Sequence, residues 1–104
     1  MLYLMMNKGD NTVKVGYAKR GRVEGRRAEY KTHNPLAIMR SSCAGTKDLE
    51  KVCHQRLAEM GKRISGTEWF VVDDWTFNHL FVRGMGALGI TTPIHFHEEF
   101  ENRG

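Results

Sequence analysis

The alternation of hydrophobic and polar residues predicts two short strands at the start of the chain. Residues 2–6 (LYLMM) and 12–17 (TVKVGY) are rich in strand-forming residues, and the Asn, Gly and Asp of the intervening NKGDN favour a turn. We therefore expect a β-hairpin. Side chains alternate along a strand, so Lys14 and Gly16 should share one face of the sheet. Tyr3 on the first strand and Lys14 on the second can then lie close together once the strands pair.

A helix is predicted most clearly over residues 46–63, where hydrophobic residues recur at helical spacing. Thr46 can cap its start and Gly61 can end it. The hydrophobic positions are Leu49, Val52, Cys53, Leu57 and Met60.

Four further segments complete the secondary-structure prediction. The basic residues 19–32 are expected to form a short helix that ends before Pro35, because a residue that precedes proline is disfavoured in a helix. Residues 36–42 and 67–72 read as strands. The last helix is expected from residue 73, with a stripe formed by Trp75, His79 and Val82.

The resulting order, β-β-α-β-α-β-α, predicts a small α+β domain with a mixed or antiparallel sheet flanked by helices. A chain of 104 residues is long enough for one core. We expect the domain to span residues 1–90 and residues 91–104 to form a loosely held C-terminal tail.

Hydropathy and cysteine content favour a cytoplasmic location. No apolar run approaches the roughly 18 residues of a membrane-spanning helix, and the first ten residues lack the basic region of a signal peptide. The two cysteines, Cys43 and Cys53, match no zinc-binding pattern. Cys53 lies on the apolar side of the predicted helix, so a buried thiol is the expectation.

Positive charge is concentrated in the first part of the chain. Residues 1–40 carry nine Lys and Arg against three acids, whereas residues 41–104 carry seven against nine. This asymmetry favours a polyanionic partner, although a solvated basic face would have the same composition. The candidate nucleic-acid contacts are Lys19, Arg20, Arg22, Arg27 and Lys31.

Several residue types suited to phosphodiester hydrolysis are present. The reaction needs an activated water, cations near the phosphoryl oxygens and, in many enzymes, a metal held by a carboxylate. Glu50 and His54 share one helix face at i,i+4 spacing, which fits either a metal site or a surface pair. Residues 68–70 (EWF) read as core packing, with Glu68 facing outward or capping a neighbour. The HFH of residues 95–97 has a two-ligand spacing without an evident third ligand.

An ordered series of motifs resembles the GIY-YIG nuclease superfamily, and most closely a phage- and virus-associated branch with a KIG-type second motif and a downstream EWF. The corresponding segments are MLY at 1–3, KVG at 14–16, RRAEYKTHNP at 26–35, LEKVCHQRL at 49–57 and EWF at 68–70. The resemblance covers residues 1 to about 82 and implies a small GIY-YIG-like domain.

The resemblance also implies residue roles. Tyr3 would accept a proton from the attacking water, Lys14 would orient or deprotonate that water, and Tyr17 would line the site. Arg26, with Arg27 as its close rival, would bind the scissile phosphate. Glu50 would ligate a single divalent metal, Mg²⁺ or alternatively Mn²⁺.

The function expected from this resemblance is metal-dependent endonuclease activity on double-stranded DNA, with low sequence specificity because most contacts would go to phosphates. Two alternatives remain open. One is an inactive nucleic-acid-binding module on the same fold, and the other is a small phage-type protein that binds a host factor. The oligomeric state is also open, with a homodimer as one possibility.

Overall fold

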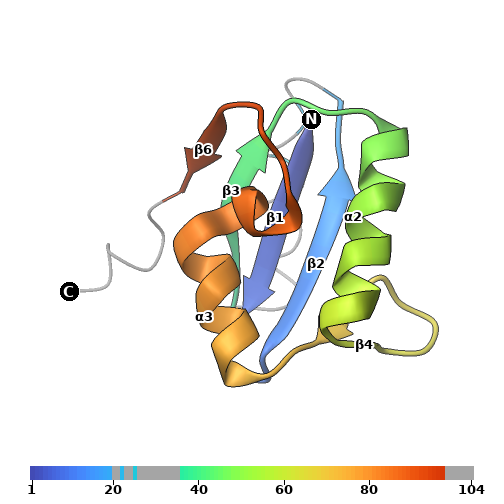
Figure 1. Cartoon of the computed structure of the whole chain (residues 1–104), viewed down its shortest axis with the longest axis vertical. Helices are drawn as coiled ribbons and strands as arrows, with labels where there is room; N and C mark the ends of the chain where they lie inside the picture. Colours follow the sequence, from blue (N-terminus) through green and yellow to red (C-terminus); the bar gives the residue numbers. More distant parts are fainter. Residues whose placement is uncertain (20–21, 23–24, 26–35, 98–104) are drawn as a thin grey trace.

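A computed structural model of the chain describes residues 1–19, 22, 25 and 36–97. Within them, a six-stranded antiparallel sheet has the strand order β4-β5-β2-β1-β3-β6, and two α-helices pack with it (Figure 1). The strands are β1 (Leu2–Asn7), β2 (Thr12–Tyr17), β3 (Ala37–Cys43), β4 (Lys62–Arg63), β5 (Phe70–Val71) and β6 (Ile94–Phe96). The helices are α2 (Lys47–Met60), α3 (Asp74–Arg83) and the 3₁₀ helix η1 (Gly84–Leu88). The predicted α+β class is confirmed, and of the mixed or antiparallel sheet that was expected, the described strands form an antiparallel one. The helix predicted over residues 19–32 falls almost wholly outside the described residues.

The predicted hairpin is formed by β1 and β2, which pair from Leu2 with Tyr17 to Asn7 with Thr12. Short polar side chains shape its turn. The Asn7 side chain accepts a hydrogen bond from the Gly9 amide, and Asp10 accepts one from the Thr12 amide. These local bonds between side chains and nearby amides fix the turn and so support the register of the two strands.

Strand β1 lies between β2 and β3 near the middle of the sheet, and all its residues are buried. Its alternate side chains belong to two hydrophobic clusters on opposite faces. The larger cluster contains Leu2, Leu4 and Met6 together with residues of α2, α3 and η1. The smaller cluster contains Tyr3 and Met5, with residues of β3 and the partly buried Trp69. Burial on both faces explains why LYLMM reads as a continuous apolar run.

Helix α2 begins and ends as its sequence predicts. The Thr46 side chain accepts a hydrogen bond from the Leu49 amide, and the Gly61 amide bonds to the Leu57 carbonyl. Cys53 and Leu57 are buried in the larger cluster. The helix runs alongside β2 (Figure 1), and its His54 side chain reaches the Val15 carbonyl of that strand.

Helix α3 is capped by Asp73, which accepts a hydrogen bond from the Thr76 amide. Hydrogen bonding with the side chain and then with the backbone of Thr76 lowers the pKa of Asp73. The predicted stripe lies mostly on the outside of this helix, because Trp75 and Val82 are exposed. The Trp75 ring stacks on His79. The core contacts of α3 come instead from another face of the helix, which carries Phe77 and Leu80.

The predicted strand at residues 67–72 is limited to two residues, Phe70 and Val71. Strand β6 differs from the expectation of a loosely held tail. Ile94–Phe96 pair with Cys43–Ser41 of β3. The physical reason is that the backbone N–H and C=O groups along the outer edge of β3 need hydrogen-bond partners, and this segment supplies them. Arg40 adds to the contact, since its guanidinium bonds to the carbonyls of Phe81 and His97.

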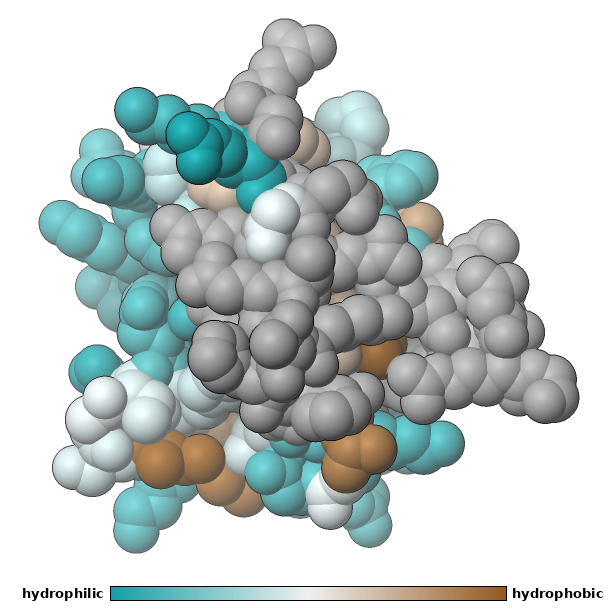
Figure 2. Space-filling view, turned by 180° about the vertical axis from the view of Figure 1, so that it is seen from behind, coloured by the Kyte–Doolittle hydropathy of each residue, from teal (hydrophilic) through white to brown (hydrophobic). Residues whose placement is uncertain are grey.

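Both thiols are free and buried, as expected for Cys53. Burial raises the pKa of Cys53 to about 11 and also raises the pKa of Cys43. Among the described residues, no helix is long and apolar enough to cross a membrane. Seen from behind, most of the coloured surface is hydrophilic, with hydrophobic side chains gathered toward its lower edge (Figure 2).

Candidate active site

Tyr3 and Gly16 are directly opposite each other on β1 and β2. Tyr3 is 2% exposed, and a Cβ atom at Gly16 would lie 2.3 Å from both the Cζ and the Oη atom of the Tyr3 ring. That distance is far shorter than any non-bonded contact, so the ring occupies the space that a side chain at position 16 would fill. The glycine is therefore required by the position of the tyrosine ring.

Lys14 lies on the same face of the sheet as Tyr3. It pairs with Met5, so that Tyr3, two residues before Met5, is its diagonal neighbour, and the Lys14 side chain is 13% exposed. Its Nζ atom is 4.0 Å from Glu68 Oε1. The expectation that strand pairing brings Tyr3 and Lys14 to one face is confirmed by this register.

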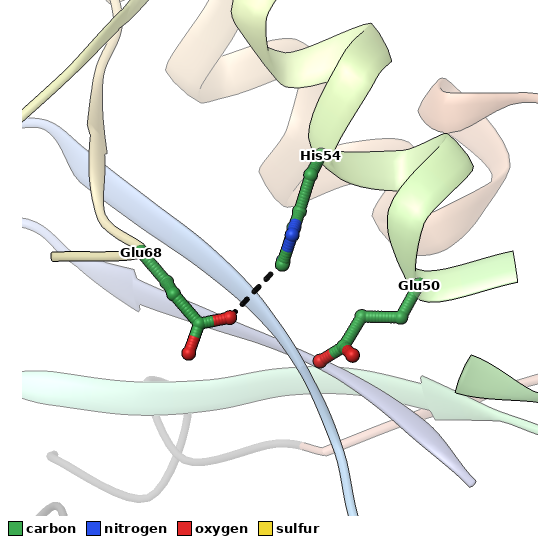
Figure 3. A group of neighbouring side chains, drawn as sticks. All are labelled: Glu50, His54 and Glu68. Atoms are coloured by element: carbon green, nitrogen blue, oxygen red, sulfur yellow. Dashed lines mark ion pairs between the residues drawn. The ribbon is translucent and has the colours of Figure 1, made fainter. Parts of the chain in front are cut away.

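Three side chains converge beside the outer edge of β2. Glu50 and His54 come from successive turns of α2, and Glu68 comes from the loop between β4 and β5 (Figure 3). One donor atom of each lies within 4.8 Å of those of the other two. The shared helix face predicted for Glu50 and His54 is therefore present, and the third member comes from a different part of the chain.

The imidazole of His54 connects α2 to β2. On β2, strand β5 pairs with Thr12 and Val13. Two residues further along β2, the carbonyl of Val15 lies 2.8 Å from His54 Nε2. A carbonyl oxygen only accepts hydrogen bonds, so Nε2 carries a proton and donates it. The same nitrogen is 3.5 Å from Glu68 Oε2. Because Nε2 is protonated, it has no lone pair for a metal.

The remaining donors of this group are two carboxylates, which fit a hard divalent cation. Mg²⁺ is typically held in proteins by one or two carboxylates and keeps several of its waters. Glu50 is partly buried and the Glu68 side chain is 48% exposed, so the cluster is open to solvent on one side.

Sequence reasoning missed Glu68 as part of this group. Of the two positions expected for Glu68, facing outward or capping a neighbour, the structure shows an exposed side chain, while Phe70 is buried and Trp69 packs against the smaller cluster. The proximity of Glu68 to Glu50 depends on the path of the β4–β5 hairpin, which no local pattern indicates. The neighbouring turn residue Gly66, with φ of 77°, is the one local sign that the chain reverses there.

The other predicted site residues are placed as follows. The Tyr17 side chain alternates to the face opposite Lys14, where it packs against the larger cluster with the Lys47 ammonium 5.8 Å from its ring centroid. The structure thus does not bring Tyr17 to the Tyr3–Lys14 face. Lys19 and Arg22 are exposed. The remaining candidates, Arg20, Arg26, Arg27 and Lys31, lie outside the described residues.

The HFH segment, which consists of the last two residues of β6 and the residue that follows, reaches the same face of the sheet. His95 pairs with Ser42, which is itself the partner of Tyr3 on β1, and His97 Nε2 lies 3.1 Å from the Ser42 hydroxyl. The rings of His95 and His97 meet edge to face at 4.6 Å. Contacts with Ser42 of β3 therefore hold both histidines in place.

The architecture is that of a small GIY-YIG-like α+β domain, with a tyrosine and a lysine on one sheet face and a carboxylate group at the adjoining edge. The sequence model of the T5orf172 domain matches residues 1–82, so the chain belongs to the T5orf172 domain family. This family is phage-associated and related to GIY-YIG-type and HNH-type nuclease-like domains. The match extends from β1 into α3 and leaves β6 outside. Searches of curated proteins and of solved structures found no match.

Proposed function

We propose that this protein is a metal-dependent endonuclease that hydrolyses phosphodiester bonds of double-stranded DNA. The observation that carries the proposal is the placement of Tyr3 over Gly16, with Lys14 on the same sheet face and Glu50 beside the same strand. Family membership supports a nuclease-like activity without specifying the reaction. The motif series of the KIG-type branch supports the specific roles given below.

In the proposed mechanism, each group acts on a different part of the reaction. Tyr3, reacting as the phenolate, accepts a proton from the attacking water and becomes the phenol, and Lys14 orients that water or stabilises the charge that develops beside it. Gly16 allows the Tyr3 ring to take its position across the strand pair. Arg26, with Arg27 as its rival, binds the scissile phosphate through charge-assisted hydrogen bonds.

Glu50 is the proposed ligand of Mg²⁺, with Mn²⁺ as an alternative. When bound, the metal would supply a positive charge that stabilises the phosphoryl oxygens and the leaving group. Glu50 is suited to hold it because α2 is capped just before this turn and is held against β2 by His54.

DNA is the proposed partner because Lys and Arg outnumber Asp and Glu by nine to three in the first 40 positions. Lys19 and Arg22 are exposed and available for phosphate contacts, and Arg20, Arg27 and Lys31 are proposed to add to them. Contacts with phosphates give affinity with little sequence discrimination, so we expect low sequence specificity and binding that weakens as salt increases.

The test is nicking of supercoiled plasmid by the full chain in Mg²⁺, in Mn²⁺ and in EDTA. We expect nicking in either metal and none in EDTA, and we expect Glu50→Gln to reduce the rate by at least about 100-fold. Glu59→Gln is the matched control, because Glu59 is an exposed residue of the same helix.

Undiminished nicking by Glu50→Gln would refute the role of Glu50. A wild-type chain that shifts DNA in a salt-sensitive way without cleaving it would be a binding module on a nuclease-like fold. A chain that neither cleaves nor binds DNA at low salt would point instead to a protein partner.

A further inference from the structure

We infer that Glu68 is a second oxygen ligand of the divalent cation, beside Glu50, and that His54 is a positioning residue for this pair; the inference rests on the proposed function for the presence of a metal. The starting point is the convergence of the three side chains from α2 and from the β4–β5 loop (Figure 3). Residues from two distant segments therefore meet at the edge of β2, next to the face that carries Tyr3 and Lys14.

The loop that carries Glu68 is held in place by its own hydrogen bonds. The Arg63 guanidinium donates to the Thr67 carbonyl at 2.6 Å, and the Thr67 hydroxyl donates to the Ile64 carbonyl at 2.9 Å. On the other side of Glu68, Trp69 packs against the smaller hydrophobic cluster and Phe70 is buried in the larger one. The Glu68 backbone is thus fixed on both sides, which is the arrangement that a metal ligand needs.

His54 orients the carboxylate of Glu68. Its Nε2–H group donates to the Val15 carbonyl at 2.8 Å and faces Glu68 Oε2 at 3.5 Å. One proton therefore faces both the backbone of β2 and the carboxylate. Nε2 is therefore not itself a ligand, and the two carboxylates of the group favour Mg²⁺ or Mn²⁺ over softer metals.

A simpler alternative is that Glu68 only fastens the β4–β5 loop to β2 and α2. Its ion pair with Lys14 is 4.0 Å long, and its side chain is about half exposed. Ion pairs of this kind contribute little to stability, because solvent screens them. Two carboxylates held close together also repel each other, and a divalent cation between them would remove that repulsion. Both arguments favour a ligand role.

The test is direct titration of the full-length protein with Mn²⁺, followed by isothermal calorimetry and by the loss of the free Mn²⁺ EPR signal. We expect Glu68→Gln and Glu50→Gln each to weaken Mn²⁺ binding at least about tenfold, since each removes one charged ligand. Glu59→Gln, which removes the same charge from an exposed site on α2, should bind as the wild type does. Wild-type affinity in Glu68→Gln would overturn the inference.

Thermal unfolding in EDTA separates a ligand from a fastening contact. If Glu68 is a ligand, Glu68→Gln should unfold at nearly the wild-type temperature in EDTA but gain less stability from added Mn²⁺. A lower unfolding temperature in EDTA together with an unchanged Mn²⁺ affinity would mean that Glu68 only fastens the loop, and would overturn the inference.

The positioning role of His54 has its own readout. His54→Leu removes the donor to Val15 and should weaken Mn²⁺ binding several-fold, whereas His54→Gln keeps an N–H donor and should restore part of the affinity. Equal wild-type affinity in both variants would overturn this part.

Failure of the inference can be distinguished from failure of the proposed function. Mn²⁺ binding that depends on Glu68, without DNA cleavage, would keep the metal site and reject the nuclease. Metal-dependent nicking with Mn²⁺ affinity unchanged in Glu68→Gln would keep the nuclease and reject Glu68 as a ligand.

Discussion

At the scale of single residues, the contact between Tyr3 and Gly16 makes a sharp prediction. Gly16→Ala places a methyl group where the Tyr3 ring lies, so the ring or the strand must move. We expect a loss of about 1–3 kcal/mol in the free energy of unfolding, as is usual for overpacking. Urea denaturation measures this loss.

The control for this substitution is Gly25→Ala, because a Cβ atom at Gly25 would meet nothing within 4 Å. In a Tyr3→Leu background the cost of Gly16→Ala should shrink, since the ring that it clashes with is gone. An equal cost in both backgrounds would show that the tyrosine ring is not the obstacle.

A second prediction at this scale concerns Cys53 and alkaline pH. Its pKa is raised from 9.0 to about 11 in the folded protein by burial, so the unfolded chain loses this proton at lower pH than the folded one. The stability that depends on the protonated thiol is therefore complete below pH 9 and is lost as pH rises toward 11. We expect the free energy of unfolding to fall by about 1 kcal/mol per pH unit in this window.

The measurement is urea denaturation between pH 8 and 11 of the wild type and of Cys53→Ala. The variant should show a shallower pH dependence, while the smaller contribution of Cys43 remains in both proteins. Parallel curves would contradict the assignment to Cys53.

At the scale of elements, the start of α2 links helix capping to the site. The Thr46 hydroxyl accepts from the Leu49 amide, and Glu50 lies in the same first turn. Thr46→Ala should cost about 1 kcal/mol of stability. It should also weaken Mn²⁺ binding, because fraying of this turn frees Glu50. Denaturation and Mn²⁺ titration of Thr46→Ala against Thr46→Ser, which keeps the hydroxyl, provide the test, and equal results for the two would contradict it.

The elements that were predicted well are those whose signals are local. The β1–β2 hairpin follows from alternation and turn residues, and α2 follows from its periodicity and from Thr46 and Gly61 at its ends. The elements that were missed or misjudged depend on distant partners. Strand β5 is short because only Phe70 and Val71 find partners, and the exposed stripe of α3 could not be told from a buried one by spacing alone.

At the scale of the whole molecule, β6 tests where the domain ends. It supplies partners for Ser41–Cys43, and the His97 amide bonds to the carbonyl of the buried Arg40. A chain that ends at residue 90 should lose about 1 kcal/mol for each of these hydrogen bonds and should expose a strand edge that promotes aggregation. Thermal unfolding and gel filtration measure both effects.

A chain that ends at residue 97 is the matched control, because it keeps β6 and its contact with Arg40. We expect its unfolding temperature and its behaviour on gel filtration to match those of the full chain. Full stability in the chain that ends at residue 90 would instead support the domain boundary expected from the sequence.

The sequence by itself determined the local features: the α+β class, the hairpin, the capped helix, the shared face of Tyr3 and Lys14, and the pairing of Glu50 with His54 on one helix face. Each depends on residues that are near in sequence or on a simple strand periodicity. Only the tertiary structure decided three further features. The Tyr3 ring lies over Gly16, the Glu68 carboxylate lies close to that of Glu50, and His54 donates a hydrogen bond to the Val15 carbonyl. The first contact depends on the exact register of β1 against β2, and the other two depend on the packing of α2 and the β4–β5 hairpin against β2.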